Sequence, residues 1–348
     1  MRSPVRVLVV GHGRMGSAIA RLVHERPGLE LVGVRERHDV TSTIEWNGDP
    51  GCRLGSDLSE LVEVTRPEIA IQATCSRLDE VVEDIETLLG HGVHVISIAE
   101  EMVWPRASSP EVADRLDALA RAKGVGVLGT GVNPGFVLDL LIITLTGVCA
   151  NVESIRAERV NDLSPYGASV LRAQGVGLTP VAFRKGVAEG TVAGHHGFPQ
   201  SIGMIAESLG WEIERIEETR EPLLAKKRRE TEELTVEPGD VAGCLHTAVA
   251  YRQGRPAITL IHPQLLHPHL DEVETADVIE IKGSPDLRIE GHPEIPGGTA
   301  TAALAVNMIP RLLAAEPGLK SMADLPVPAA TVTDVRRLME GERRGDHG

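Results

Sequence analysis

The segment VLVVGHGRMGSAIA, residues 7–20, constrains the fold of this chain more than any other segment. Its apolar start predicts a buried strand, and a helical pattern begins a few residues later. Three glycines, Gly11, Gly13 and Gly16, stand in the corner between them. Because a fixed glycine loses more backbone entropy than any other residue, three at one junction indicate a tight turn and a close approach to another group.

Strands and helices alternate over the first third of the chain. The patterns predict strands over residues 5–10, 29–34, 68–74 and 93–99, and helices over 15–25, 56–67, 77–92 and 108–124. The last helix has the clearest ends, with Ser109 as N-cap, Pro110 at the first helical position and Gly124 just beyond the end. Short strands that alternate with helices predict an α/β fold with a Rossmann-type, doubly wound parallel sheet.

In this context the pattern G-x-G-x-x-G predicts a dinucleotide site. Gly11 allows the tight turn, Gly13 lets the backbone approach a pyrophosphate, and Gly16 lets the helix pack closely on the strand. Residues at the start of the first helix and at the end of the third strand are further candidates for cofactor binding: Arg14, Met15, Ala73 and Thr74. We therefore expect a nicotinamide dinucleotide as cofactor.

The choice between NAD and NADP depends on the end of the second strand. Glu36 lies about 20 residues beyond the last glycine, where an acidic side chain binds the ribose hydroxyls of NAD. Arg35 and Arg37 flank it, and either could instead pair with a 2′-phosphate. The sequence leaves both cofactors open.

The pattern changes after residue 130. A glycine-rich crossing, GTGVNPGF, leads into a region where segments 248–253, 257–262 and 277–283 alternate like antiparallel strands. Residues 298–315 predict one long apolar helix that returns to the first domain. We expect residues 1–132, completed by about 300–340, to form the dinucleotide-binding domain, and residues 133–299 to form an α+β domain with a mainly antiparallel sheet for substrate binding and homodimerisation.

Composition excludes several classes of protein. The chain has 348 residues and a net charge of −15, and its one dense basic run, Lys226-Lys227-Arg228-Arg229, is interpreted as a solvated helix face rather than a nucleic-acid site. Four well-separated cysteines, Cys52, Cys75, Cys149 and Cys244, predict neither a metal site nor disulfides and suit the cytoplasm. The apolar segment 136–149 is too short for a membrane span and predicts a buried helix, so we expect no membrane partner.

Longer motifs resemble known families. The opening GHGRMG resembles the N-terminal domain of dihydrodipicolinate reductases, but the second-domain signature of that family, a histidine pair followed by lysine and a Ser-Gly-Thr turn, is missing. ISIAEEM, GTGVNPGFVLDLL, RVND, GVGLTPVAF, GHHGFPQSIGMIAESLGW and TATAALAVNMIPRLLAAEPGL resemble, in this order, the 2,4-diaminopentanoate dehydrogenases and native amine dehydrogenases. This second resemblance covers nearly the whole chain.

The resemblance implies NAD(P)-dependent oxidative deamination of an amine, or the reverse reductive amination of a ketone with ammonia. Such chemistry needs a base that also stabilises an iminium cation, and a carboxylate does both. Glu100 and Glu101 follow a strand at the carboxyl edge of the expected sheet, and we favour Glu100 because successive side chains point opposite ways. Both could instead be solvated charges. Asn133 could bind the substrate or the nicotinamide carboxamide, or serve only as a turn residue before Pro134.

The second domain supplies the candidate substrate-binding residues. Arg159 and Asn161 alternate along RAERVND and should share one strand face, and Arg159 could bind a substrate carboxylate. His195, His196 and His262 are further candidates, whereas His246, His267 and His269 are interpreted as incidental. The alternatives are a cyclic-imine reductase of the dihydrodipicolinate reductase type and a non-catalytic nucleotide-binding protein.

Overall fold

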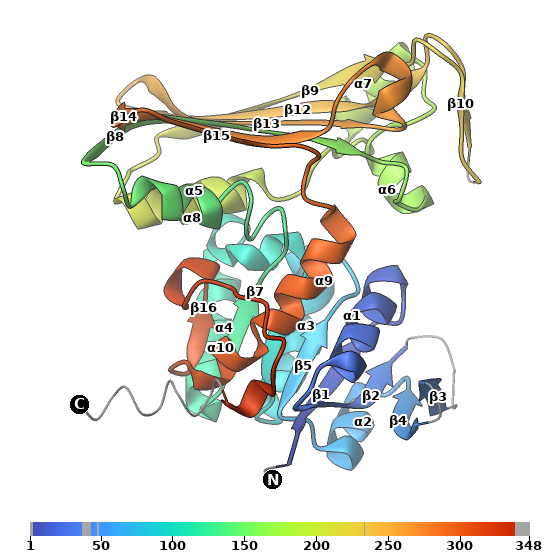
Figure 1. Cartoon of the computed structure of the whole chain (residues 1–348), viewed down its shortest axis with the longest axis vertical. Coiled ribbons are helices and arrows are strands. Elements are labelled where there is room, and N and C mark those ends of the chain that lie inside the picture. Colours follow the sequence, from blue (N-terminus) through green and yellow to red (C-terminus); the bar gives the residue numbers. More distant parts are fainter. Residues whose placement is uncertain (1–2, 37–42, 47–48, 233, 338–348) are drawn as a thin grey trace. The chain divides into compact units, whose positions relative to one another are not determined.

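The computed structural model describes residues 3–36, 43–46, 49–232 and 234–337, and these residues form two compact units (Figure 1). Unit 1 comprises residues 1–136 and 296–348, and unit 2 comprises residues 137–295. Arg37 lies outside the described residues, so its expected part in cofactor binding has no structural counterpart. None of the helices in the described ranges is long and apolar enough to cross a membrane.

Unit 1 is built on an eight-stranded sheet, counted over the described residues, in the order β16-β7-β6-β5-β1-β2-β4-β3. Neighbouring strands are parallel except β3 and β4, which are antiparallel. The strands are β1 (Val5–Val10), β2 (Leu29–Arg35), β3 (Thr43–Trp46), β4 (Asp49–Gly55), β5 (Ile69–Gln72), β6 (His94–Ser97), β7 (Gly126–Gly129) and β16 (Gly318–Lys320). The predicted doubly wound parallel sheet is therefore confirmed.

The helices of the first domain also agree with the sequence patterns. They are α1 (Arg14–Glu25), α2 (Leu58–Thr65), α3 (Leu78–Gly90) and α4 (Pro110–Lys123). Helix α4 begins where the Ser109 side chain accepts the Val112 N–H, and it ends at Gly124, whose φ of +71° is left-handed. Helices α2, α3 and α4 pack on one face of the sheet through an apolar cluster that includes Leu8, Val10 and Val95.

The single long helix predicted over residues 298–315 is wrong. The chain forms two helices, α9 (Gly297–Asn307) and α10 (Ile309–Ala314), with the break at Met308. Pro310 explains the break, because proline has no N–H for the helical ladder and is tolerated only in a first turn. Helix α9 packs against α1, within unit 1.

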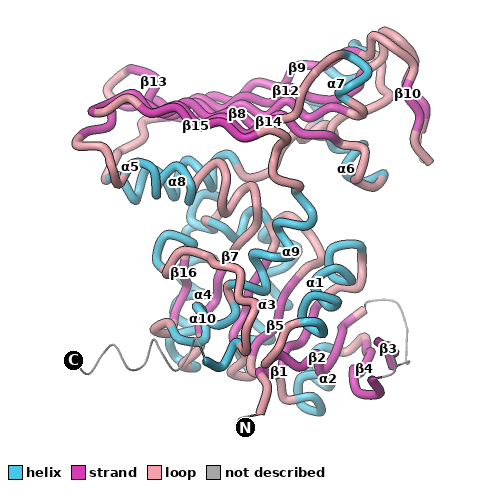
Figure 2. The backbone as a smooth tube through the Cα atoms, viewed as in Figure 1, coloured by secondary structure: helices cyan, strands magenta, loops and turns pink. Residues whose placement is uncertain are grey.

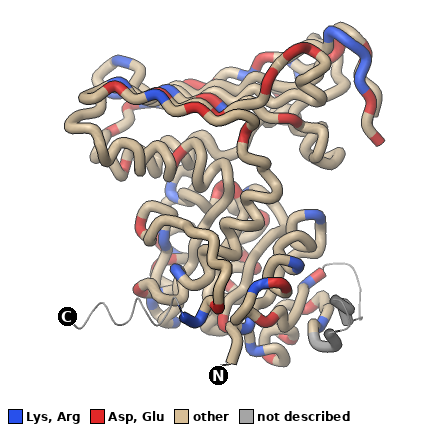
Figure 3. The backbone as a smooth tube through the Cα atoms, in the orientation of Figure 1, with Lys and Arg blue, Asp and Glu red and all other residues tan. Residues whose placement is uncertain are grey.

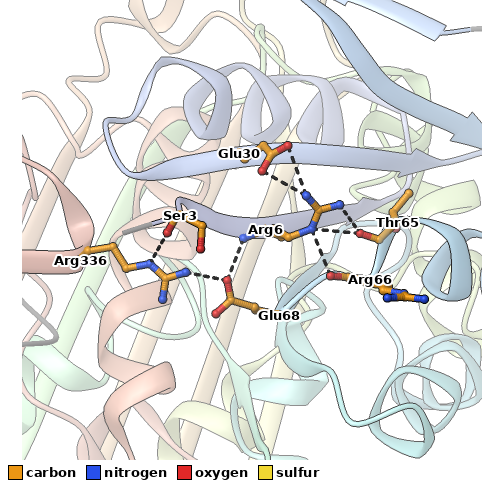
Figure 4. Close-up of polar contacts among 7 residues, drawn as sticks. All are labelled: Ser3, Arg6, Glu30, Thr65, Arg66, Glu68 and Arg336. Carbon is orange, nitrogen blue, oxygen red and sulfur yellow. Dashed lines mark hydrogen bonds and ion pairs between the residues drawn. The ribbon is translucent and has the colours of Figure 1, made fainter. Parts of the chain in front are cut away.

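The C-terminal part of unit 1 is fastened to the start of the chain (Figure 4). Arg336 forms an ion pair with Glu68 at 2.7 Å and donates to the Ser3 carbonyl at 3.0 Å. Glu68 also accepts the N–H of Arg6, a residue of β1. Such half-exposed ion pairs contribute little stability, so the main anchor is the neighbouring Val335, which is 1% exposed and donates its N–H to the Pro27 carbonyl.

Unit 2 contains a six-stranded sheet in the order β15-β14-β8-β13-β12-β9. Strands β8 and β13 are parallel and the other neighbours are antiparallel, as predicted for a mainly antiparallel sheet. The strands are β8 (Asn151–Asp162), β9 (Arg215–Leu224), β12 (Val241–Arg252), β13 (Arg255–Leu265), β14 (Ala276–Ser284) and β15 (Leu287–Gly291). Helices α5 (Leu140–Thr146) and α8 (Phe198–Leu209) lie along one face of it (Figure 2).

Shorter elements complete unit 2. They are α6 (Ala168–Ala173), α7 (Pro180–Glu189) and a hairpin of β10 (Arg229–Glu230) and β11 (Thr235–Val236). The basic run at residues 226–229 leads into this hairpin (Figure 3), so its interpretation as a helix face is wrong. Arg229 is buried, pairs with Asp271 at 2.7 Å and donates to the Leu266 carbonyl. A charge that is buried needs such partners, and here it anchors the hairpin.

Candidate functional site

Gly11 and Gly16, in the corner between β1 and α1, form the tight turn and the close packing that the sequence predicts. Gly11 has a φ of +106°, and a Cβ there would lie 2.6 Å from the Ala73 carbonyl oxygen. A Cβ on Gly16 would lie 1.9 Å from the Gly11 carbonyl oxygen, so only glycine lets α1 pack this closely. A Cβ on Gly13 would meet nothing within 4 Å. The position that should face a pyrophosphate is therefore open.

Helix α1 begins at this open position. Gly13 is its N-cap and has no side chain to satisfy the first N–H groups, which favours an anion there. Arg14 is exposed and Met15 half-buried in the first turn. After β5, Ala73 contacts the glycine corner, and Thr74 accepts a hydrogen bond from Gln72, which in turn accepts one from Ser97. These residues fit a bound dinucleotide phosphate.

The end of β2 separates the two candidate ribose residues. The Glu36 carboxylate accepts the His12 N–H at 3.2 Å, so it lies beside the glycine corner. The Arg35 guanidinium is directed elsewhere: it pairs with Asp84 of α3 at 3.3 Å and donates to the Ser56 carbonyl at 3.1 Å. Both side chains of that pair are largely buried. Glu36 therefore lies at the glycine corner, and Arg35 is engaged with α3.

Glu100 and Glu101 begin a short 3-10 helix, η1 (Glu100–Val103), directly after β6. The Glu101 carboxylate accepts the Leu78 N–H at 2.7 Å, and the Glu101 N–H donates to the Ser76 carbonyl. Because the N-cap of α3, Arg77, makes no side-chain cap bond, Glu101 caps α3 in its place. Glu100 is half-buried. The structure thus gives the two adjacent carboxylates different surroundings.

Asn133 follows β7 in unit 1 and carries two orphaned atoms. Its Oδ1 and Nδ2 are both buried and have no hydrogen-bond partner among the described residues. Thr130 Oγ1 and Asn307 Oδ1 are likewise buried without a partner in that part of the chain. Buried polar groups are normally paired, so each marks a place where a bound polar group can donate or accept. An amide side chain can donate to and accept from the carboxamide group of a nicotinamide at the same time.

Unit 2 gathers polar side chains at one end of one sheet face. Strand β8 contributes Arg159 and Asn161, which are both buried and share a face as predicted. Strand β13 contributes His262 and Gln264, and Gln264 lies opposite Asn161 in the β8–β13 register. The Asn161 Oδ1 and Gln264 Oε1 atoms have no hydrogen-bond partner among the described residues. The face therefore has buried acceptors without donors.

Arg159 is held by the protein itself. Its guanidinium pairs with Asp277 at 2.5 Å and donates to the Ile295 carbonyl at 2.5 Å. The Arg159 carbonyl accepts from His262 Nδ1 at 2.6 Å, which fixes the proton of His262 on Nδ1. Burial lowers the pKa of His262 to about 3. His262 is therefore neutral at neutral pH.

The His195 ring stands at the centre of the unit 2 cluster. It makes edge contacts with His262 and Phe198, each with 4.9 Å between ring centroids. Its Nε2 is buried and lacks a partner among the described residues, and burial holds its pKa well below the usual range. His196, the next residue, is half-buried. The structure thus brings His195 and His262 together.

The interpretation of His246 as incidental is wrong. It lies opposite His262 in the β12–β13 register, is fully buried, and its Nδ1 accepts the His195 N–H at 3.1 Å. Gln264 was also missed. The signal for both is strand alternation, because His246 and Gln264 fall on the same buried face as Cys244 and Leu260. Among the described residues, no three His, Cys, Asp or Glu side chains are grouped as metal ligands.

Comparison with known proteins identifies the family of the chain. Residues 136–341 match the family model described as 2,4-diaminopentanoate dehydrogenase C-terminal domain, and residues 5–98 match dihydrodipicolinate reductase, N-terminus. The chain is 39% identical to the 2,4-diaminopentanoate dehydrogenase of Acetoanaerobium sticklandii over 98% of each chain. It is 26% identical to an amine dehydrogenase of Streptomyces virginiae over 93% of this chain and 96% of that protein.

A solved structure of similar shape leads to the same family. The amine dehydrogenase from Mycobacterium smegmatis superposes with a TM-score of 0.85 at 25% identity, over 95% of this chain and 99% of that one. Fold and comparisons together define a nicotinamide-dependent dehydrogenase. The chain belongs to the 2,4-diaminopentanoate dehydrogenase family, and its activity is that of an NAD(P)-dependent amine dehydrogenase.

The open position at Gly13 generates a test of the phosphate site. Gly13→Val should leave the fold intact, since no atom lies within 4 Å of the new Cβ, at a cost of about 1 kcal/mol for the changed N-cap. The side chain would occupy the phosphate position, so NADH affinity measured by calorimetry should fall by about a hundredfold or more. Gly16→Ala, by contrast, should lower the melting temperature, because its Cβ overlaps the Gly11 carbonyl. Unchanged NADH binding by Gly13→Val would contradict the assignment.

The buried histidines of unit 2 should make stability depend on pH. The pKa of His262 is about 3 in the folded chain against 6.5 unfolded, so the unfolded state takes up the proton first as the pH falls. Above pH 6.5 His262 is neutral in both states and does not lower the free energy of unfolding. As the pH falls from 7 to 5, uptake of the proton by the unfolded state lowers the free energy of unfolding by about 2 kcal/mol. In urea denaturation at pH 7 and at pH 5, His262→Gln should show a smaller difference between the two free energies of unfolding than the wild type. His91→Gln, at an exposed position, should leave that difference unchanged.

Proposed function

We propose that this enzyme oxidatively deaminates a small amine that carries a second amino group, and in reverse aminates the corresponding ketone with ammonia. The relatives named after amine substrates support the reaction class, and the name of the Acetoanaerobium enzyme supports a diamino acid. The mechanism rests on one observation: the adjacent carboxylates of Glu100 and Glu101 have different surroundings. Glu101 caps α3, and we take Glu100, at the carboxyl edge of the parallel sheet, as the base.

Glu100 supplies the charge that this reaction needs. An ionised carboxylate beside the substrate carbon stabilises an iminium cation as it forms, and it then accepts a proton from the attacking water or gives one to the departing amine. The position of Glu100 after β6, at the carboxyl edge of a parallel sheet, supports this role. Capping of α3 by Glu101 holds η1, and with it Glu100, against the N-terminus of that helix.

NAD is the cofactor that unit 1 favours. Gly11, Gly13 and the first turn of α1, with Arg14 and Met15, would hold the pyrophosphate, and Asn133 would bond the carboxamide. The contact of Glu36 with the glycine corner and the ion pair of Arg35 with Asp84 support ribose hydroxyls over a 2′-phosphate. When bound, the nicotinamide accepts hydride from the carbon that bears the amine. In this proposal unit 1 is the dinucleotide-binding domain.

Unit 2 is proposed to bind the second amino group. The orphaned Asn161 Oδ1 and Gln264 Oε1 are acceptors, and in this proposal His195 carries its proton on Nδ1, so that its orphaned Nε2 is an acceptor as well. An ammonium group is a donor with three N–H bonds. Arg159 is already paired with Asp277, so it is less suited to hold a substrate carboxylate alone. His196 and His262 complete this candidate substrate set. The expected cytoplasmic location remains part of the proposal.

Removal of the Glu100 charge tests the mechanism. Glu100→Gln keeps the shape of the side chain but neither stabilises an iminium nor accepts a proton, so turnover should fall by about 10² or more. The Kd of NADH should stay unchanged. Glu101→Gln is the matched control, because its amide oxygen still accepts the Leu78 N–H and turnover should change by no more than a few-fold. The opposite pattern in steady-state assays would make Glu101 the base.

We also propose a homodimer formed through unit 2. Helices α5 and α8 lie along one face of its sheet (Figure 1). The inner strands β12 and β13 carry half-exposed Thr247, Val249 and Ile261 on the other face. A second copy of this face would cover them. Ile261→Asp should therefore give a monomer in light scattering. Val327→Asp, at an exposed apolar position of unit 1, should leave the dimer intact, and a monomeric wild-type chain at micromolar concentration would refute the proposal.

A further inference from the structure

The backbone of residues 193–195, just before the His195 ring, is fixed from two sides. From α6, the Ala173 carbonyl accepts the Gly194 N–H at 3.0 Å, and the amide of the adjacent Gln174 donates to the Gly194 carbonyl at 2.9 Å. From strand β9, Arg220 Nε donates to the Ala193 carbonyl at 2.7 Å. Four backbone groups in a row are paired once the bond from His195 N–H to His246 Nδ1 is included.

Glu218 determines which nitrogen of His246 carries the proton. Its carboxylate lies 2.8 Å from His246 Nε2, and a carboxylate only accepts, so Nε2 is the donor. Nδ1 then keeps its lone pair and can accept the His195 N–H. Arg220 pairs with the same Glu218 oxygen at 2.7 Å. The three side chains therefore form one network that ends on the segment 193–195.

The packing around Gly194 makes this network rigid. Gly194 has a φ of +69°, and a Cβ there would lie 3.0 Å from His246 Nδ1 and 3.4 Å from Arg220 Nε. Backbone and imidazole are thus in direct contact, with no room for a side chain. His246 also packs its ring on Phe198, with 4.8 Å between centroids, and Phe198 packs on His195. The orientation of the His195 ring is therefore set by its backbone and by its neighbours.

From this geometry we infer that Glu218, His246 and Arg220 are positioning residues, which hold His195 so that its Nε2 accepts a hydrogen bond from the second amino group of the substrate. The inference rests on the proposed function of unit 2. It explains why a polar network of buried His246 and partly buried Glu218 and Arg220 holds the backbone of a residue whose imidazole Nε2 has no partner among the described residues. An interior network of this kind fixes one side-chain orientation.

Two substitutions of His246 separate its two hydrogen bonds. His246→Asn places an amide oxygen near the Nδ1 position and can still accept the His195 N–H. His246→Gln places its amide near the Nε2 position, so it keeps the bond to Glu218 and loses the one to His195. The KM for 2,4-diaminopentanoate should rise about tenfold in His246→Gln and less than threefold in His246→Asn. The Kd of NADH should not change in either variant.

A monoamine probe distinguishes positioning from general damage. With pentan-2-amine, which has no second amino group, the KM should be the same in both variants and in the wild type. Equal KM increases for the diamino acid in both variants, or an equal increase for the monoamine, would overturn the inference. Failure of the wild type to oxidise either amine would instead refute the proposed function.

If His246→Gln does not fold, a second pair of variants, at Glu218 and Glu217, tests the same positioning role. Glu218→Gln removes the charge that holds both His246 and Arg220, and it should raise the KM for 2,4-diaminopentanoate at least threefold. Glu217→Gln is the matched control, because Glu217 is exposed and pairs with Arg215 at the surface. Equal KM values for these two variants would overturn the inference.

Discussion

The contact between Gly16 and the Gly11 carbonyl oxygen sets the geometry on which unit 1 depends. A Cβ on Gly16 would lie 1.9 Å from that oxygen, so α1 leaves β1 at a distance that only glycine permits. This close departure places the first turn of α1 at the corner, where the N-cap Gly13 provides no side-chain cap. It also brings the His12 N–H within 3.2 Å of Glu36, at the end of the next strand. One backbone contact thus places the phosphate and ribose ends of the candidate cofactor site.

The polar end of the unit 2 sheet follows a different rule, because its side chains are buried and must be paired. Arg159 has Asp277, and His246 has Glu218. Desolvation keeps His195 and His262 uncharged, and the edge contact of their rings places two neutral imidazoles side by side. Against this background of satisfied groups, the orphaned amide oxygens of Asn161 and Gln264 stand out as the places where a ligand can bond.

Much of the architecture could be predicted from sequence because local signals and tertiary structure agree there. The bounds of β1 match the prediction, and α4 has the predicted N-cap and C-terminal glycine. The failures occurred where tertiary contacts decide. The basic run at 226–229 looks solvated in isolation, yet Arg229 is buried because Asp271, more than 40 residues later, can pair with it. His246 looked incidental because its partners, Glu218 and the His195 N–H, lie far from it in the sequence.

The adjacent glutamates show why a motif can identify a site without assigning its atoms. In the sequence Glu100 and Glu101 are equivalent carboxylates after a strand, and alternation alone separates them. In the structure Glu101 accepts the Leu78 N–H at the start of α3 and so has a structural role in that helix. A carboxylate that caps a helix is held in place by the backbone N–H that it accepts. The N-terminus of α3 lacks a cap from its own N-cap side chain, and Glu101 supplies that cap. The sequence of the two glutamates alone does not reveal this difference between them.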